Sequence, residues 1–101
     1  MSLIKHPEYQ AFPLYHIVTT AGIANYIREN PPMVKAIEHC LARHARKDFG
    51  DIDQHDKEQN EYAIVNRLRV LSSYQLNDMT KIWIITDQYE HATTILLPEE
   101  Y

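Results

Sequence analysis

The last third of the chain, residues 67–101, reads RLRVLSSYQLNDMTKIWIITDQYEHATTILLPEEY, and this stretch decides the fold. Three runs of β-favouring residues follow one another at 67–73, 82–85 and 93–97. Alternation with a period of two in the first run is typical of a strand, and the second run is apolar on both faces, as in a central strand. Asn, Asp and Gln fill the short connections. The stretch therefore predicts three strands joined by two turns.

Within residues 14–44, upstream of this stretch, one strand and two helices are predicted. The apolar run over 14–19 indicates a first strand, and Thr20 is placed to cap a short helix after it. Apolar residues recur at helical spacing across 33–44, which is the clearest helical pattern in the chain. Asn30 and the two prolines after it are expected to end the short helix before them and to begin this one, because Asn is a strong N-cap and proline fits the first turn.

A third helix is predicted over 53–65, where Asp53 and Asp56 have the spacing of a cap. The element order is then β-α-α-α-β-β-β. It predicts a single α+β domain over residues 1–101, with a four-stranded, mainly antiparallel sheet and helices packed on one face. We expect nine apolar residues in the core: Val34, Ile37, Leu41, Phe49, Val70, Ile82, Ile84, Ile95 and Leu97.

The composition is that of an ordinary folded domain. The chain has 101 residues, of which 45% are hydrophobic and 24% charged, so it can bury a core without a metal or a disulfide. The single cysteine, Cys40, indicates a reducing compartment. No apolar run approaches the ~20 residues of a membrane span, and the first residues lack the pattern of a signal peptide. We therefore expect a soluble, cytoplasmic protein that does not bind a membrane.

Negative charge is concentrated in residues 48–61, DFGDIDQHDKEQNE, which we call the acidic segment. It holds six acidic side chains and one lysine, a local charge of −5, whereas the whole chain carries −4. Nucleic-acid binding requires a broad basic face. Only a short stripe of Arg67, Arg69 and Lys81 offers one here, so we expect no direct contact with nucleic acid.

The patterns that would indicate a metal or a catalytic site are incomplete. Cys40 and His44 share a helix face, but two ligands do not make a zinc site. Asp51 and Asp53 have the opening spacing of a calcium loop, but the required glycine and the final glutamate are missing. The serines lie in a predicted strand without the glycines of a nucleophile elbow. We therefore expect no metal, no cofactor and no catalytic residue.

Protein binding is the function class that the side chains favour. Seven tyrosines are many for a chain of this length, and tyrosine is a preferred interface anchor. The acidic segment offers charge complementarity to a basic partner. The predicted partner-binding patch consists of Asp48, Asp51, Asp53, Asp56, Glu58, Glu61 and Tyr62. A second interpretation of the same acids stays open, namely helix capping and a solvated helix start.

Six segments of the chain carry a resemblance to a known family: FPLYHIVTTAG (12–22), LARH (41–44), KDFGDIDQHDKEQN (47–60), RVLSSY (69–74), KIWIIT (81–86) and ATTILLPEEY (92–101). They resemble a family of small bacterial proteins of uncharacterised function that occur on plasmids, integrative elements and prophages. WIIT followed by TTILLPEEY is the most specific part. The chain departs from the family at Lys47, where relatives tend to have glycine, and at Phe49, where they tend to have tryptophan.

The resemblance implies a context and no mechanism. Small acidic proteins of mobile elements are often inhibitors of host defence, meaning anti-CRISPR or anti-restriction proteins, which cover a partner surface and need no active site. The resemblance therefore implies a non-enzymatic inhibitor that binds a host protein or defence complex through a basic surface of that partner. Two alternatives remain: a structural or regulatory accessory protein of the element that forms a homodimer through its sheet, and a small enzyme.

Overall fold

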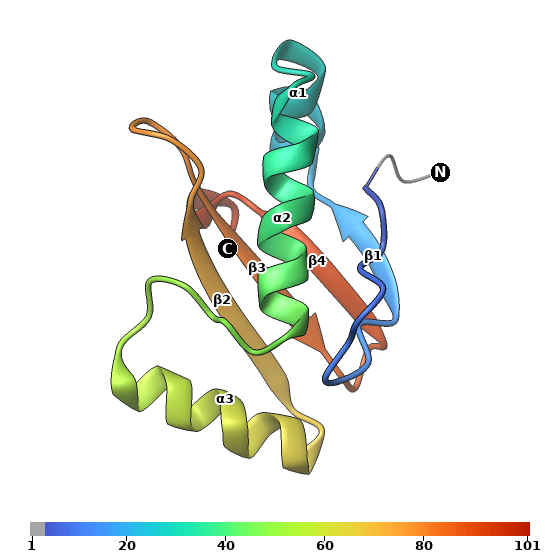
Figure 1. The fold of residues 1–101 in the computed structure, drawn as a ribbon, viewed down its shortest axis with the longest axis vertical. Helices are drawn as coiled ribbons and strands as arrows, with labels where there is room; N and C mark the ends of the chain where they lie inside the picture. Colours follow the sequence, from blue (N-terminus) through green and yellow to red (C-terminus); the bar gives the residue numbers. More distant parts are fainter. Residues whose placement is uncertain (1–3) are drawn as a thin grey trace.

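The computed structural model describes residues 4–101 and contains one mixed sheet with three α-helices around it (Figure 1). The elements in chain order are β1 (His16–Thr19), α1 (Ala21–Glu29), α2 (Met33–Ala45), α3 (Gln54–Asn66), β2 (Arg69–Gln75), β3 (Lys81–Asp87), β4 (Ala92–Leu96) and the 3-10 helix η1 (Pro98–Glu100). This order and the mainly antiparallel sheet confirm the predicted α+β class.

The sheet has the strand order β1-β4-β3-β2. The last three strands pair as antiparallel neighbours, as their short connections require. β1 joins the other side of β4 in parallel, which is the only parallel pairing among the described strands. β3 lies inside the sheet, as expected for a strand that is apolar on both faces. The two edges of the sheet are therefore β1 and β2.

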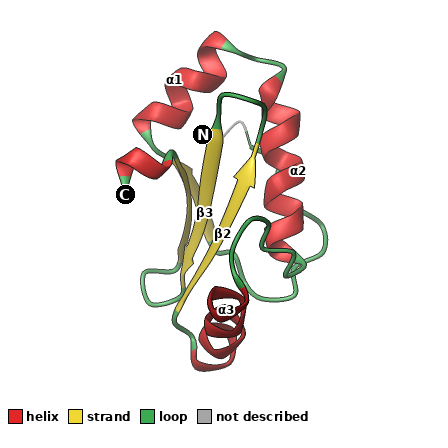
Figure 2. Cartoon of the chain, turned by 90° about the vertical axis from the view of Figure 1, so that its left-hand side faces the viewer, coloured by secondary structure: helices red, strands yellow, loops and turns green. Residues whose placement is uncertain are grey.

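The helices take different positions around the sheet. α2 lies across one face, whereas η1 lies on the opposite face (Figure 2). α1 crosses the end of the sheet near β1 and β4, and α3 lies beside β2 (Figure 1). The core fills the space between the sheet and α2. Of the nine predicted core residues, seven are buried, and Val34 and Leu97 are half-buried against the core.

Two of the three predicted helix starts are confirmed. The hydroxyl of Thr20 accepts a hydrogen bond from the N–H of Ile23 at 3.3 Å, which caps α1. A carboxylate oxygen of Asp53 accepts from the N–H of Asp56 at 2.8 Å, which caps α3. Both caps satisfy a backbone donor that has no partner inside its own helix.

The predicted start of α2 at Asn30 is wrong. α2 begins at Met33, and its N-cap is Pro32, which already has a helical backbone conformation. Asn30 does end α1, as predicted, and its N–H donates to the carbonyls of Tyr26 and Ile27. Asn30 therefore serves the helix before the prolines, because its backbone N–H can still reach the last turn of α1.

The outer edge of β2 is closed by side-chain and loop contacts. The Asn60 amide donates to the carbonyl of Leu71 at 2.7 Å and accepts from the Leu71 N–H at 3.0 Å, as a neighbouring strand would. Two residues further on, Ser73 donates its N–H to the carbonyl of Phe49 at 3.1 Å, and its carbonyl accepts from Asp51 at 2.7 Å. An exposed strand edge invites aggregation, and these contacts remove that risk at β2.

Replacing Asn60 with alanine is expected to lower the free energy of unfolding by about 2 kcal/mol, because two hydrogen bonds to Leu71 are lost together. Urea denaturation measures the effect. Gln59→Ala is the matched control, since Gln59 is exposed on the same helix. Equal stability of the two variants would contradict the role of Asn60 at the β2 edge.

Candidate protein-binding surface

The structure places the seven predicted partner-binding residues along one side of the molecule, in α3 and the loop before it. Three of the six acids are engaged within the fold. Asp48 forms an ion pair with Arg43, Asp53 caps α3, and Glu61 forms an ion pair with Lys47 at 2.9 Å.

Asp48 is the most firmly held of these acids. The Arg43 guanidinium donates to both of its carboxylate oxygens, at 2.8 and 3.1 Å. This pairing lowers the pKa of Asp48. Arg43 also lies 4.8 Å from the centre of the Tyr74 ring, and the Tyr74 hydroxyl donates to the Asp48 carbonyl at 2.6 Å. Asp48 therefore fixes the turn between α2 and α3.

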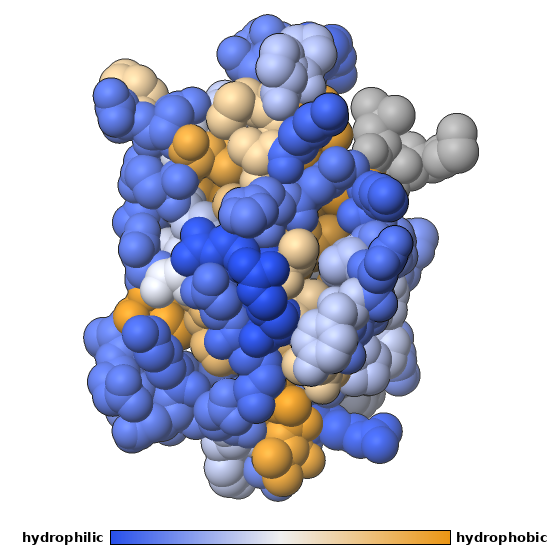
Figure 3. All heavy atoms as spheres, in the orientation of Figure 1, coloured by the Kyte–Doolittle hydropathy of each residue, from blue (hydrophilic) through white to orange (hydrophobic). Residues whose placement is uncertain are grey.

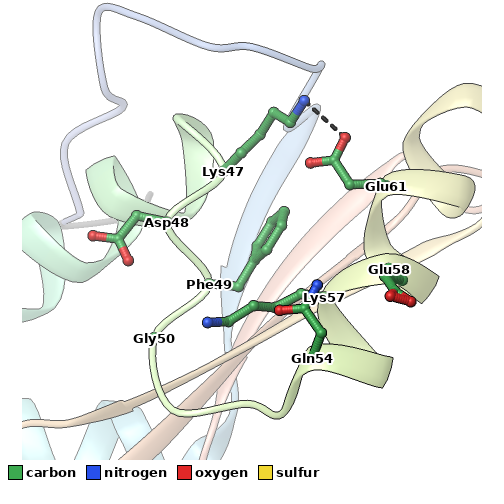
Figure 4. A pocket seen from close by; sticks show the side chains of 8 residues that line it. All are labelled: Lys47, Asp48, Phe49, Gly50, Gln54, Lys57, Glu58 and Glu61. Atoms are coloured by element: carbon green, nitrogen blue, oxygen red, sulfur yellow. Dashed lines mark ion pairs between the residues drawn. The ribbon is translucent and has the colours of Figure 1, made fainter.

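Lys47 and Glu61 approach each other across a shallow pocket of about 250 Å³ (Figure 4). Lys57 and Glu58 also line this pocket. Asp48 points away from Glu61, and the ring of Phe49 lies between the loop and α3 (Figure 4). Because two lysines stand among the acids here, the negative charge is partly neutralised at this pocket.

The other three acids stay uncompensated on the surface. Asp51, Asp56 and Glu58 are exposed, and their carboxylates form no hydrogen bond or ion pair with the described residues 4–101. The free negative charge of the acidic segment therefore lies on the outward side of α3 and at its N-terminal end.

α3 also exposes apolar side chains on its outward side. It buries only Asn60 and Ala63, while Tyr62 is 58% exposed and Val65 is 80% exposed. The spacing of Glu58, Tyr62 and Val65 places them one above the other on one helix face. We call Asp51, Asp56, Glu58, Tyr62 and Val65 the α3 surface.

A second group of exposed side chains extends this surface toward the sheet. Tyr62, Leu68 and Tyr89 help to line a pocket of about 480 Å³ beside β2. In the view of Figure 3 most of the surface is hydrophilic, and hydrophobic side chains reach it only in separate places, one of them at the lower end where α3 lies. Val65, Leu68 and Tyr89 were not predicted as site residues. The signal for Val65 is its helical spacing from Tyr62, opposite the buried Asn60.

The basic stripe that the sequence allowed is not formed. Arg67 ends α3 in a left-handed backbone conformation and lies outside β2. Arg69 lies opposite Asp87 in the sheet, and Lys81 lies at the far end of the same strand pair, opposite Gln75. Arg69 and Lys81 therefore point to the same sheet face but lie at opposite ends of the strand pair, and Arg67 lies outside β2, so the three cations form no continuous stripe.

The side chains of Cys40 and His44 are both buried in the core. His44 is fully buried, and its two ring nitrogens lie 2.5 Å from the Ser72 hydroxyl and 2.9 Å from the Thr86 hydroxyl. Burial raises the pKa of Cys40 to about 11, which disfavours the thiolate that a metal would bind. Within residues 4–101, no three His, Cys, Asp or Glu side chains gather as they would around a metal ion.

No helix of the described chain combines the length and the apolar character that spanning a bilayer requires. Comparison with protein-family models, curated proteins and solved structures finds no match for this chain. The fold and the surface together define a small α+β domain with an acidic and partly apolar helix on its outside.

Proposed function

We propose that the protein is a non-enzymatic inhibitor from a bacterial mobile element, which binds a basic surface of a host defence complex through the α3 surface. The observation that carries this proposal is the outward side of α3. There Tyr62 and Val65 are exposed on the same helix face as Glu58, while Asp51 and Asp56 lie at the N-terminal end of α3. The carboxylates of these three acids have no partner among residues 4–101. Exposed apolar side chains rimmed by charge are typical of interaction sites.

The chemistry of this surface matches a basic partner in two ways. Uncompensated carboxylates steer a positive surface into contact and can pair with its arginines. Tyr62 adds a rigid aromatic side chain, the kind of residue that often supplies most of the binding energy at an interface. Asp48, Asp53 and Glu61 are engaged by partners within the fold, so they are not expected to supply the main contacts to the partner protein.

The triple variant Asp51→Asn, Asp56→Asn and Glu58→Gln is expected to abolish capture of a defence complex from a lysate that carries active CRISPR and restriction systems. The single variant Tyr62→Ala should weaken capture at least tenfold. Folding is expected to stay intact, because the four side chains are exposed. Affinity capture read by mass spectrometry measures the first effect, and urea denaturation measures the second.

The matched control neutralises three exposed glutamates elsewhere: Glu8, Glu29 and Glu99. It changes the net charge by the same amount and should leave capture unchanged. Equal loss in both triple variants would assign the effect to net charge and contradict the α3 surface. Unchanged capture in the first triple variant would also contradict it.

One observation favours the accessory-protein alternative, in which the chain forms a homodimer through its sheet. On the face opposite α2, Trp83 is half-buried, and its only aromatic cover among the described residues is Tyr101, at 5.5 Å between ring centres. Tyr101 is itself 68% exposed. Light scattering distinguishes the two functions, since a dimer that Trp83→Ala dissociates would favour the accessory protein.

A further inference from the structure

Within residues 4–101, β1 has no strand on its outer side and, unlike β2, no backbone hydrogen bonds there. Its N–H groups alternate in direction: His16 donates to His91 at 3.4 Å, and Thr20 donates to Ile95 at 3.1 Å, both toward β4. The residues between them, Ile17 and Thr19, therefore direct their N–H and C=O groups away from the sheet. None of these four backbone groups forms a hydrogen bond within residues 4–101.

A groove of about 700 Å³ lies along this edge. Its wall facing β1 is mostly apolar and comes from the N-terminal segment, α1 and α2, through Ile4, Ala24, Ile27, Pro31 and Val34. Ile17 is only 2% exposed, so its backbone groups lie at the floor of the groove. Unpaired backbone groups in such a place are costly, and a neighbouring strand would satisfy them.

The groove carries positive charge and no negative charge among its lining residues. Arg28 is the only Lys, Arg, Asp or Glu among its lining residues. Arg28 is exposed and forms no ion pair within the described part of the chain. A ligand with a carboxylate beside Arg28 would therefore be favoured over a neutral or basic one.

We propose that an extended, apolar segment of a partner protein, carrying an acidic residue, docks in this groove and adds a strand to the sheet beside β1. Ile17 and Thr19 would donate and accept the strand hydrogen bonds, the apolar wall would cover alternate side chains, and Arg28 would pair with the acid. The site lies at the opposite sheet edge from α3 (Figure 1), so this inference is independent of the proposed function.

A second copy of the chain fits this groove less well than such a segment. Pairing two β1 strands about a two-fold axis at Val18 would satisfy the same backbone groups. It would also place two copies of Arg28 at one interface, while neither groove supplies an acid. Like charges at an interface oppose association. The charge of the groove therefore selects a foreign acidic segment.

Hydrogen exchange followed by NMR tests the site directly. The probe is an acetylated six-residue peptide of alternating valine and threonine that ends in aspartate, and its twin ends in lysine. The aspartate peptide is expected to slow amide exchange of Ile17 and Thr19 at least tenfold, whereas Val18, whose N–H points to β4, stays slow throughout. No slowing at millimolar peptide overturns the proposal. Slow amide exchange of Ile17 and Thr19 in the dilute protein without peptide also overturns the proposal.

Reversing the charge of Arg28 provides a second test of the site. The wild type should bind the aspartate peptide at least fivefold more tightly than the lysine peptide, and Arg28→Glu should reverse that preference. Arg46→Glu, an exposed change at the far end of α2, should keep it. A preference that Arg28→Glu leaves unchanged overturns the role of Arg28. Protection that rises with protein concentration, without peptide, assigns the edge to a second copy and overturns the peptide site.

Discussion

Replacing Gly50 with alanine is expected to lower the free energy of unfolding by about 4 kcal/mol, among the larger effects of a single substitution. Gly50 has a φ of +74°, a conformation that disfavours any side chain. A Cβ atom there would lie near the carbonyl oxygen of Ser73, at 2.1 Å, and near the Tyr74 ring, at 2.7 Å. The loop would have to leave the edge of β2.

Thermal and urea denaturation measure this loss, and Gly22→Ala is the control. A Cβ atom at Gly22 would lie 2.6 Å from a carboxylate oxygen of Glu100. Glu100 is exposed, so its side chain can move aside with the loss of the hydrogen bonds that it accepts from Gly22, Thr20 and Leu97. The cost is expected to stay at or below about 2 kcal/mol. Similar losses at both positions would show that the contact with the β2 backbone is not what makes Gly50 necessary.

Gly50 also illustrates how far the sequence determines this fold. The sequence predicts a buried Phe49 next to it, and Phe49 is buried. It does not predict that this loop closes the edge of β2 through Ser73, because the two segments are more than twenty residues apart. Local signals, such as the caps at Thr20 and Asp53, were predictable because each needs only residues within one helical turn.

The candidate site was predictable in its outline and not in its details. The acidic segment does lie along one side of the molecule, beside Tyr62. The engagement of Glu61 depends on Lys47 approaching across the pocket, a contact that no helical spacing indicates. Asn60 looks like one more polar residue of a solvated helix, and only the position of β2 turns it inward. Pairing between distant segments is what the sequence left open.

His44 is the strongest case of a residue whose role comes from distant partners, because a directed chain of hydrogen bonds fixes its protonation. The Leu14 carbonyl only accepts, so Thr93 donates to it at 2.5 Å and must accept from Thr86 at 2.7 Å. Thr86 then accepts from Nε2–H of His44 at 2.9 Å. Nδ1 is left bare and accepts from the Ser72 hydroxyl at 2.5 Å. The network holds a neutral imidazole with its proton on Nε2.

Acid is therefore expected to destabilise the protein well above the pH at which carboxyls titrate. Burial lowers the pKa of His44 from 6.5 to about 3. Below pH 6.5 the unfolded chain binds a proton there that the folded protein does not, so the free energy of unfolding falls by about 1.4 kcal/mol per pH unit. Between pH 6.5 and 4.5 the expected loss is about 2 kcal/mol, because the unfolded imidazole is already half protonated at pH 6.5.

This pH window isolates His44 from the carboxyls with a lowered pKa. Asp48 and Glu100 have ordinary pKa values of 3.8 and 4.5, so their contributions are lost only below about pH 4.5. Urea titrations at pH 6.5, 5.5 and 4.5 measure the slope. The double variant His44→Leu and Ser72→Ala removes both the imidazole and the hydroxyl that donates to it. Its free energy of unfolding should fall less steeply as the pH decreases, by the contribution of one proton, about 1.4 kcal/mol per pH unit.

The protonation state can also be read without unfolding the protein. Nitrogen chemical shifts of the His44 ring should remain those of the neutral Nε2–H form at pH 5, because protonating Nδ1 would place a charge in the core and remove the acceptor for Ser72. An imidazole that titrates near pH 6.5 in the folded state would contradict the directed network. In that case the slope should vanish as well, since folded and unfolded chains would then bind the same proton.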